Sequence, residues 1–395
     1  GSTVCPVLRS QTKVTFAPTP VSTATPAGDA SPPPPAPTVL PPPPPTSPAP
    51  APAAGSTAGS ISCAHWFGGI GCAAHQLPPV FAPACYFDSD SVANEVFASS
   101  FPSVPRSGSF DEAMASGSDF MQAAKACRVG FGSPPCTDIS SVNRNRDESS
   151  ACAELTVDCV RKLAEVQHEM FCMETVTNVT SARGGHLLAS IYAVSDEAGY
   201  IPQLFCLDPL RLGGHQSRCR AYMFFTRKDV HAARGPFVPP AAYQVLGTPT
   251  SVRHLLDPVS EVPPPEQYPH SAPTWTPVDV DRDPSHRGPQ LLFLSGSKTR
   301  RMRCYSVDSP AACLTTNTCW IFDPRPGVDR CRRYITAELL RIQGLPASLV
   351  DDLPPMRAHQ YIGLGTEGIC MRTVGTAIAD YLGVEPDATP VTTCL

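Results

Sequence analysis

The sequence lacks the features that mark membrane and secreted proteins. No apolar run reaches the roughly 18 residues that a membrane-spanning helix needs. No secretory signal opens the printed sequence, and none of its 17 cysteines belongs to a CxxC pair. We therefore expect reduced thiols in an intracellular protein rather than a framework of disulfides.

Charge is almost absent from the first part of the chain. Between Lys13 and Asp88 the only charged residue is Asp29, and residues 18–54 hold 16 of the 47 prolines. Such a segment has little to bury and favours extended polyproline II. We therefore expect residues 1–60 to form a disordered proline-rich arm, which leaves about 335 of the 395 residues for folded domains.

The net charge of −5 does not indicate nucleic-acid binding, but the local distribution of charge matters more than the total. Four basic residues lie within six positions: Lys298, Arg300, Arg301 and Arg303. This cluster can grip a phosphate backbone, although a solvated basic turn has the same composition.

Apolar runs alternate with helical patterns after the arm, which indicates a βαβ architecture with a mostly parallel sheet. Strands are predicted at residues 61–66, 84–87, 128–132, 170–173 and 221–225. Helices are predicted around residues 155–166, 336–342 and 369–382. Residues 227–290 are rich in proline and show little periodicity, so we predict a smaller, irregular domain there.

A glycine turn follows the first predicted strand and contains Phe67, Gly69 and Gly71. Glycines at such a place let backbone N–H groups approach a ligand, although many such turns are ordinary structure. About twenty residues further on, Asp88 and Asp90 end the second predicted strand, where a carboxylate commonly accepts ribose hydroxyls. Capping of the next helix is the alternative role.

A possible nucleophile follows the third predicted strand. Pro134 and Pro135 stiffen the approach to Cys136. A cysteine reacts as a thiolate, which needs a positive or dipolar environment, and Arg144 and Arg146 lie close by in the sequence. The alternative is buried packing, the role expected for most of the other cysteines.

Two further strand ends carry charge. Glu174 follows the apolar run 170–173, where a carboxylate can hold or donate a proton, unless it is a surface turn residue. Gln216, Arg218 and Arg220 alternate and are predicted to share one face of a strand. Guanidinium groups suit phosphate or a base carbonyl, although an amphipathic edge strand would look the same.

Zinc binding is not expected, because the candidate ligands have no common tetrahedral spacing. These candidates are Cys63, His65, Cys72 and His75.

The motifs occur in the order of a known family, and the chain resembles the cytosine carbon-5 DNA methyltransferases. The family's aromatic-glycine, acidic, Pro-Cys, Glu-Asn-Val and Gln-x-Arg-x-Arg motifs match the residues above, with Ser140 at its downstream serine. Later matches lie at residues 333–338, 343–346 and 360–363, so that the resemblance covers roughly residues 61–385.

Three departures from the family pattern are present. Thr175 replaces the asparagine after the glutamate, which is expected to loosen the loop that positions Glu174. Leu364 replaces the asparagine after Gly363. The acidic residue of the third strand is missing unless Asp111 takes its place. The last two departures are expected to weaken cofactor binding.

The resemblance implies a Rossmann-like class I S-adenosylmethionine-dependent methyltransferase fold. It divides the folded part into a catalytic domain, residues 61–226 and 291–395, and a small target-recognition domain, residues 227–290. S-adenosylmethionine would be the cofactor, and no metal is expected. The implied cofactor-binding residues are Phe67, Gly69, Gly71, Asp88, Asp90, Pro134 and Gly363.

The implied reaction is methyl transfer to carbon 5 of a cytosine flipped out of duplex DNA. Its implied catalytic residues are Cys136, Glu174, Arg218 and Arg220, and its implied DNA contacts are Ser140, Arg144, Arg146, Gln216, Lys298, Arg300, Arg301 and Arg303. A monomer without membrane contact is expected, located in the nucleus and serving epigenetic methylation if the source is eukaryotic. The alternatives are a transfer-RNA cytosine-5 methyltransferase and a catalytically silent relative that binds nucleic acid or a partner.

Overall fold

The computed structural model describes residues 60–136, 138–140, 151–238, 251–262, 274–278, 288–295, 302–316, 320–326 and 331–385. Internal contacts divide the chain into two units, Gly1–Thr57 and Ala58–Leu395, and every described residue belongs to the second. The predicted arm, residues 1–60, therefore lies outside the described residues except for Ser60. Among the described residues, no helix combines the length and apolar character that a membrane span requires.

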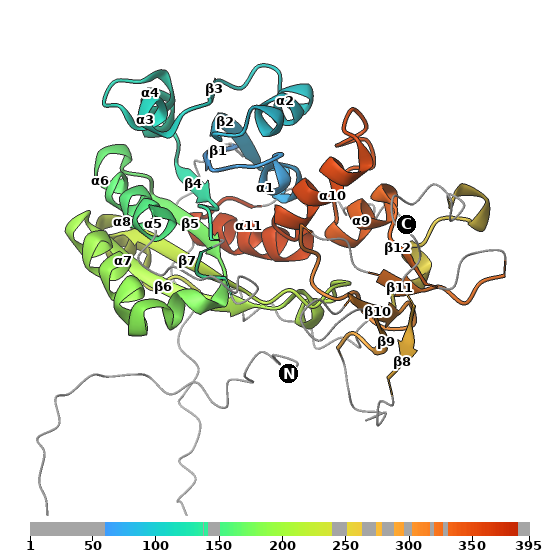
Figure 1. Cartoon of the computed structure of the whole chain (residues 1–395). Coiled ribbons are helices and arrows are strands. Elements are labelled where there is room, and N and C mark those ends of the chain that lie inside the picture. Colours follow the sequence, from blue (N-terminus) through green and yellow to red (C-terminus); the bar gives the residue numbers. More distant parts are fainter. Residues whose placement is uncertain are drawn as a thin grey trace, which may run out of the picture. The chain divides into compact units, whose positions relative to one another are not determined.

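A seven-stranded sheet forms the centre of this unit (Figure 1), in the order β3-β2-β1-β4-β5-β7-β6. Its strands are β1 Ile61–Trp66, β2 Phe81–Phe87, β3 Arg106–Ser107, β4 Val129–Gly132, β5 Met170–Thr175, β6 Tyr200–Leu207 and β7 Arg220–Arg227. Strands β1 to β5 are parallel, and β7 runs antiparallel between β5 and β6. The predicted mostly parallel α/β sheet is thereby confirmed.

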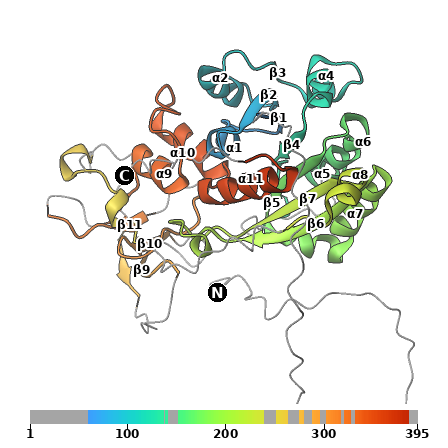
Figure 2. The same cartoon turned by 180° about the vertical axis from the view of Figure 1, so that it is seen from behind.

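Alternating side chains of the strands build two cores on opposite faces of this sheet. In β5, Phe171 and Met173 belong to one core, while Met170 and Cys172 belong to the other. The first core is covered by α3 Phe110–Met114, α4 Asp119–Lys125, α5 Ala151–Arg161, α6 Leu163–Val166 and α7 His186–Glu197. The second is covered by α8 Lys228–Arg234 and the long α11 Gly368–Leu382 (Figure 2), which packs against the short α1 Cys72–Gln76.

A second sheet has five strands in the order β12-β11-β10-β9-β8. They are β8 Thr276–Pro277, β9 Leu291–Ser295, β10 Met302–Ser306, β11 Trp320–Phe322 and β12 Cys331–Arg333. Because β8 pairs with β9, this sheet crosses the boundary that the sequence suggested at residue 290. At the other boundary, α8 packs on β6 and β7, so residues 228–234 stay with the central sheet.

A third core joins this second sheet to α2 and to the helices that follow the sheet in the sequence. Ile321 of β11 packs together with residues of α2 Ser91–Ser100, α9 Thr336–Gln343 and α10 Pro355–Leu364. Short 3₁₀ turns lie at Thr177–Thr180, Ala182–Gly185, Pro209–Arg211, Arg253–Leu255 and Val259–Glu261.

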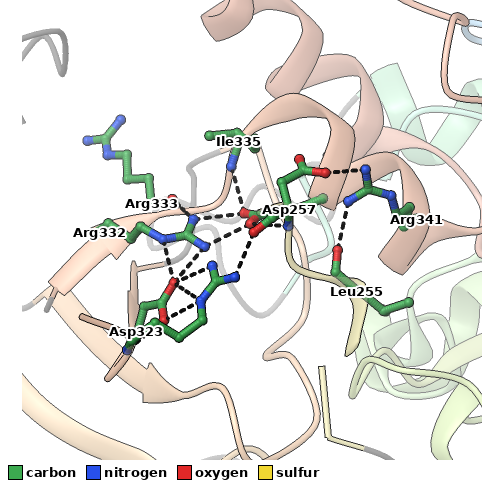
Figure 3. Close-up of polar contacts among 9 residues, drawn as sticks. Leu255, Asp257, Asp323, Arg332, Arg333, Ile335 and Arg341 are labelled. Carbon is green, nitrogen blue, oxygen red and sulfur yellow. Dashed lines mark hydrogen bonds and ion pairs between the residues drawn. The ribbon is translucent and has the colours of Figure 1, made fainter. Parts of the chain in front are cut away.

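A network of charged side chains with a buried centre reinforces this junction (Figure 3), and we name it the Arg332 network. Arg332 is fully buried and donates to Glu338 at 2.7 and 2.8 Å and to Asp323 at 3.0 Å. Its further members are Asp257, Arg325 and Arg341. Since every one of these charges has an opposite charge or a backbone partner, the network ties β11 and β12 firmly to α9.

Two elements differ from the patterns that predicted them. The helix expected around residues 155–166 is divided at Lys162 into α5 and α6. The strand expected at residues 170–173 continues to Thr175, because Glu174 and Thr175 pair with Tyr222 and Ala221 of β7. Glu174 therefore lies inside a strand rather than just after one.

Candidate functional site

The glycine turn after β1 is built from backbone conformations that favour glycine. Gly69 and Gly71 have φ angles of 55° and 81°, and even Phe67 has a positive φ of 54°. Gly68 lies against Tyr86, where an added Cβ would come within 2.5 Å of the ring. The turn therefore brings its backbone close to the ends of β1 and β2.

Two carboxylates hold this turn and the helix after it. Asp88 accepts hydrogen bonds from the backbone N–H groups of Gly69 at 2.8 Å and Asp90 at 2.9 Å, and burial raises its pKa. Asp90 caps α2 by accepting from Ala93 and also accepts from the Tyr361 hydroxyl at 2.8 Å. Helix capping, the alternative considered for this pair, is thus a role that Asp90 has.

A cavity of about 30 Å³ lies against the turn. Its lining includes Gly68 of the turn, Ser133 and Glu174 from the central strands, and Thr366 and Met371 from the end of the chain. The last helix therefore returns beside the glycine turn.

The nucleophile candidate Cys136 is half-buried one short turn beyond β4. Burial raises the pKa of its thiol to about 11, and the charge of Glu174 adds to this effect. Arg220 and Arg218 act in the opposite direction, as does the backbone N–H of Val176, which donates to the sulfur. The thiol is therefore protonated at neutral pH but lies among groups that can stabilise a thiolate.

Glu174 is buried with both carboxylate oxygens engaged. Ser133 Oγ donates to Oε2 at 2.8 Å, and Arg220 Nε lies 3.3 Å from Oε1. Burial alone would lower the pKa of the Arg220 guanidinium, but Cys313, Glu174 and Cys136 raise it above its usual range. The structure thus brings the predicted Cys136, Glu174 and Arg220 together in one site.

Arg218 has a different surrounding from Arg220. Its guanidinium donates to the carbonyl oxygens of Leu314 at 2.6 Å, Gly363 at 3.1 Å and Gly365 at 2.9 Å. These bonds tie the segment before β7 to the closing part of the chain. Since β7 begins only at Arg220, the expected single face of alternating residues from 216 to 220 does not form.

Gln216 is fully buried, and its amide is occupied inside the protein. Its Nε2 donates to Gln343 at 2.6 Å, and its Oε1 accepts from the backbone of Leu314 at 3.3 Å. Gln216 therefore lies in the protein interior in this structure, and its contact with DNA stays a prediction.

Gly363 serves close packing rather than the cavity. A Cβ on it would come within 2.1 Å of the Thr315 carbonyl oxygen, so α10 can approach this loop only with glycine there. The neighbouring Leu364 is 55% exposed. Tyr361, which lies in the matched motif 360–363 but was not among the predicted site residues, is the residue of this helix that donates to Asp90.

The other predicted residues are spread over the unit. Pro134 is buried, Ser140 is half-buried, and Arg303 is exposed on β10. Asp111 is exposed in α3. Its neighbour Phe110 stacks on Phe67, with 5.7 Å between the two ring centroids. The remaining predictions fall on residues outside the described part of the chain: Arg144, Arg146, Lys298, Arg300 and Arg301.

Metal binding has no support in the part of the chain that the structure describes. The sulfur of Cys63 lies 3.4 Å from His65 Nε2, but no group of three or more candidate ligands gathers among these residues.

Comparison with known proteins agrees with this arrangement. The sequence model of the C-5 cytosine-specific DNA methylases matches residues 63–271, which is more than half of the chain. The type II methyltransferase M.AgeI of Thalassovita gelatinovora is 31% identical over 96 residues. That match spans 24% of this chain and 22% of M.AgeI, so it covers much less than two thirds of the relative.

Three solved structures share the fold. EhMeth of Entamoeba histolytica has a TM-score of 0.58 at 15% identity, covering 82% of this chain and 99% of its own. A prophage-encoded protein of E. coli, described as a DNA modification methyltransferase, has a TM-score of 0.61 at 14% identity, covering 82% and 100%. A DNMT2 variant of Spodoptera frugiperda has a TM-score of 0.55 at 15% identity, covering 81% and 99%.

Proposed function

Since the chain belongs to the C-5 cytosine-specific DNA methylase family, we propose that it transfers a methyl group from S-adenosylmethionine to carbon 5 of a flipped-out cytosine in DNA. The observation that carries the proposal is the meeting of Cys136, Glu174 and Arg220 at one end of the central sheet. A nucleophile, a proton-holding carboxyl and a cation are the groups that this chemistry needs.

The surroundings of the glycine turn fit a nucleoside cofactor. Gly69 and Gly71 give the turn its left-handed backbone conformation, and the cavity is lined by the turn and by Glu174. Asp88 and Asp90 lie just after β2, where carboxylates commonly accept ribose hydroxyls. When bound, S-adenosylmethionine supplies an electrophilic sulfonium methyl group.

Cys136 would start the reaction as a thiolate. Its sulfur forms a bond to carbon 6 of the cytosine, which makes carbon 5 an enamine carbon able to accept the methyl group. A base then removes the proton from carbon 5, and the bond to Cys136 breaks. Since a stacked base cannot reach a half-buried thiol, the cytosine must leave the duplex first.

Glu174 would assist by holding a proton at ring nitrogen 3. Its negative charge raises the pKa of Cys136, so a proton on Glu174 removes an obstacle to forming the thiolate. Arg220 would stabilise the thiolate and hold the base carbonyl, while Arg218 acts as a positioning residue through its three carbonyl contacts.

The second sheet is proposed as the target-recognition region, together with residues 251–262 beside it. Arg303 is exposed on β10, and the basic residues before it in the sequence extend the positive charge. Basic side chains of this kind would grip the phosphate backbone.

Transfer of label tests the function and its alternatives. The protein is incubated with methyl-labelled S-adenosylmethionine and either duplex DNA or transfer RNA, beside a Cys136→Ser variant. The proposal expects label on DNA that disappears in the variant. Label on RNA alone would instead favour the transfer-RNA enzyme, and label on neither would favour a silent binding protein.

A further inference from the structure

Two side chains outside the predicted site residues connect the loop that carries Cys136 with the segment that carries Glu174. We call residues 133–136 and 138–140 the Cys136 loop, and β5 with the turn after it the Glu174 strand. Before the cysteine, Ser133 Oγ donates to Glu174 Oε2 at 2.8 Å. After it, Asn178 Nδ2 donates to the Ile139 carbonyl oxygen at 3.1 Å. The loop is therefore fastened on both sides of the nucleophile.

The Ser133 side chain is well placed to set the orientation of Glu174. Its backbone N–H donates to the Trp66 carbonyl oxygen at 3.1 Å, which holds this residue at the end of β1. Pro134 and Pro135 follow at once and restrict the backbone toward Cys136. A hydroxyl on such a stiff segment fixes one carboxylate oxygen, while Arg220 approaches the other.

Both partners of the Asn178 hydrogen bond are held in place by buried residues. Asn178 lies in the 3₁₀ turn Thr177–Thr180, next to the fully buried Val179. Its acceptor Ile139 is itself buried and packs in the first core. Both ends of this hydrogen bond are therefore anchored in the protein interior.

Asn178 also accounts for the departure at position 175. Thr175 is buried in β5, where its backbone pairs with Ala221. Its side chain has no amide group that could donate to the Cys136 loop. Three residues further on, Asn178 supplies an amide from the same segment to the same loop. Between them, the backbone N–H of Val176 donates to the Cys136 sulfur.

We infer that Ser133 and Asn178 are positioning residues that clamp the Cys136 loop onto the Glu174 strand and so set the geometry between nucleophile and acid. The inference rests on the proposed function for its kinetic consequence but not for its structural one. A displacement of about 1 Å in such a site can lower turnover by up to about a hundredfold.

Kinetic measurements on methyl transfer form the first test, with Ser133→Ala, Asn178→Ala and the double variant. Each single variant should lower kcat about tenfold while KM for DNA changes little, because the clamp acts on geometry rather than on binding. Ser133→Thr keeps a hydroxyl donor and should retain most of the activity. Ser107→Ala removes a half-buried hydroxyl of β3, away from the clamp, and serves as the matched control.

Alkylation of Cys136 by iodoacetamide, followed by peptide mass spectrometry, forms the second test and needs no substrate. A loosened loop should expose the thiol, which burial now protects, so both alanine variants should react severalfold faster than the wild type. Thermal unfolding of the same samples separates local loosening from global unfolding.

The outcomes keep the two claims apart. Unchanged kcat in both alanine variants of an active enzyme, or a Ser133→Thr variant as impaired as Ser133→Ala, would overturn the clamp while leaving the proposed function intact. If the wild type transfers no methyl group, the proposed function fails, and the alkylation rates alone then decide whether the clamp exists.

Discussion

Two arginine–carboxylate clusters in this protein differ in the number and length of the contacts between arginine and carboxylate. In the Arg332 network, Arg332 binds Glu338 through two bonds of 2.7 and 2.8 Å and Asp323 through another, and all three side chains are buried. In the site, Arg220 lies 3.3 Å from Glu174 beside a half-buried thiol. The first cluster is held by several short contacts between arginine and carboxylate, whereas in the second Arg220 makes one longer contact with Glu174 and the half-buried Cys136 thiol lies beside it.

The comparison teaches that the same residue types serve stability or chemistry according to their surroundings. A closed network of buried charges holds two elements together and is strongly disturbed when one partner is removed. The cluster around Cys136 has fewer direct ion pairs, so we expect it to contribute less to the free energy of unfolding. The raised pKa of the thiol is typical of residues that take part in proton transfer. Variants in the two clusters should therefore separate folding from turnover.

The largest effect is expected for Arg332→Met. The change leaves Asp323 and Glu338 without their shared cation and should lower the free energy of unfolding by about 3–5 kcal/mol, measured by urea denaturation. Arg253→Ala, which breaks the exposed pair with Asp308, is the matched control and should cost less than about 1 kcal/mol. Equal losses in the two variants would contradict the closed nature of the Arg332 network.

Glu174→Gln should show the opposite pattern. Turnover should fall by about a hundredfold or more, because the amide cannot pass a proton to the base, while the unfolding midpoint stays close to that of the wild type. Single-turnover methyl transfer and urea denaturation of the same sample measure both quantities. Near-normal turnover would remove Glu174 from the mechanism.

The pH dependence of Cys136 alkylation should sharpen the account of the site. With a thiol pKa of about 11, the wild-type rate should be low at neutral pH and rise continuously as the pH approaches 11. Glu174→Gln removes a charge that raises this pKa and should move the curve to lower pH, while Arg220→Gln should move it to higher pH. Shifts in the same direction would show that charge does not control the thiol.

The smallest effect concerns Asp323 and acid. Burial acts to raise its pKa, but hydrogen bonds from Arg325 and the charge of Arg332 outweigh burial and lower the pKa. The folded state thus favours the ionised form.

The stability that the Asp323 carboxylate contributes is complete above its unfolded pKa of about 3.9, and it is lost as the pH falls through the lower pKa of the folded state. The stability difference between Asp323→Asn and the wild type should therefore shrink below about pH 4, as urea midpoints at several pH values would show; a constant difference would contradict it.

Local patterns predicted much of the central sheet. Strand β1 occupies residues 61–66 as expected, because an apolar run ends at a glycine turn. The continuation of β5 through Glu174 was missed, since it depends on pairing with β7, about fifty residues away. The division between α5 and α6 was missed as well, because neither glycine nor proline marks Lys162.

The site was predicted where motifs carry the chemistry and missed where tertiary contacts decide. Cys136, Glu174 and Arg220 were predicted because they match ordered motifs of the family. Alternation alone could not reveal that the Gln216 amide is buried and donates to Gln343. Ser133 and Asn178 gave no signal, since their partners lie about forty residues away in the sequence.

Covalent trapping tests the central claim most directly. The protein is incubated with S-adenosylmethionine and a duplex that carries 5-fluorocytosine, in which the fluorine at carbon 5 cannot leave as a proton does. We predict a stable protein–DNA adduct, detected by intact mass and mapped to Cys136, that the Cys136→Ser variant does not form. An enzyme that methylates DNA yet forms no adduct, or an adduct that persists in Cys136→Ser, would contradict the account.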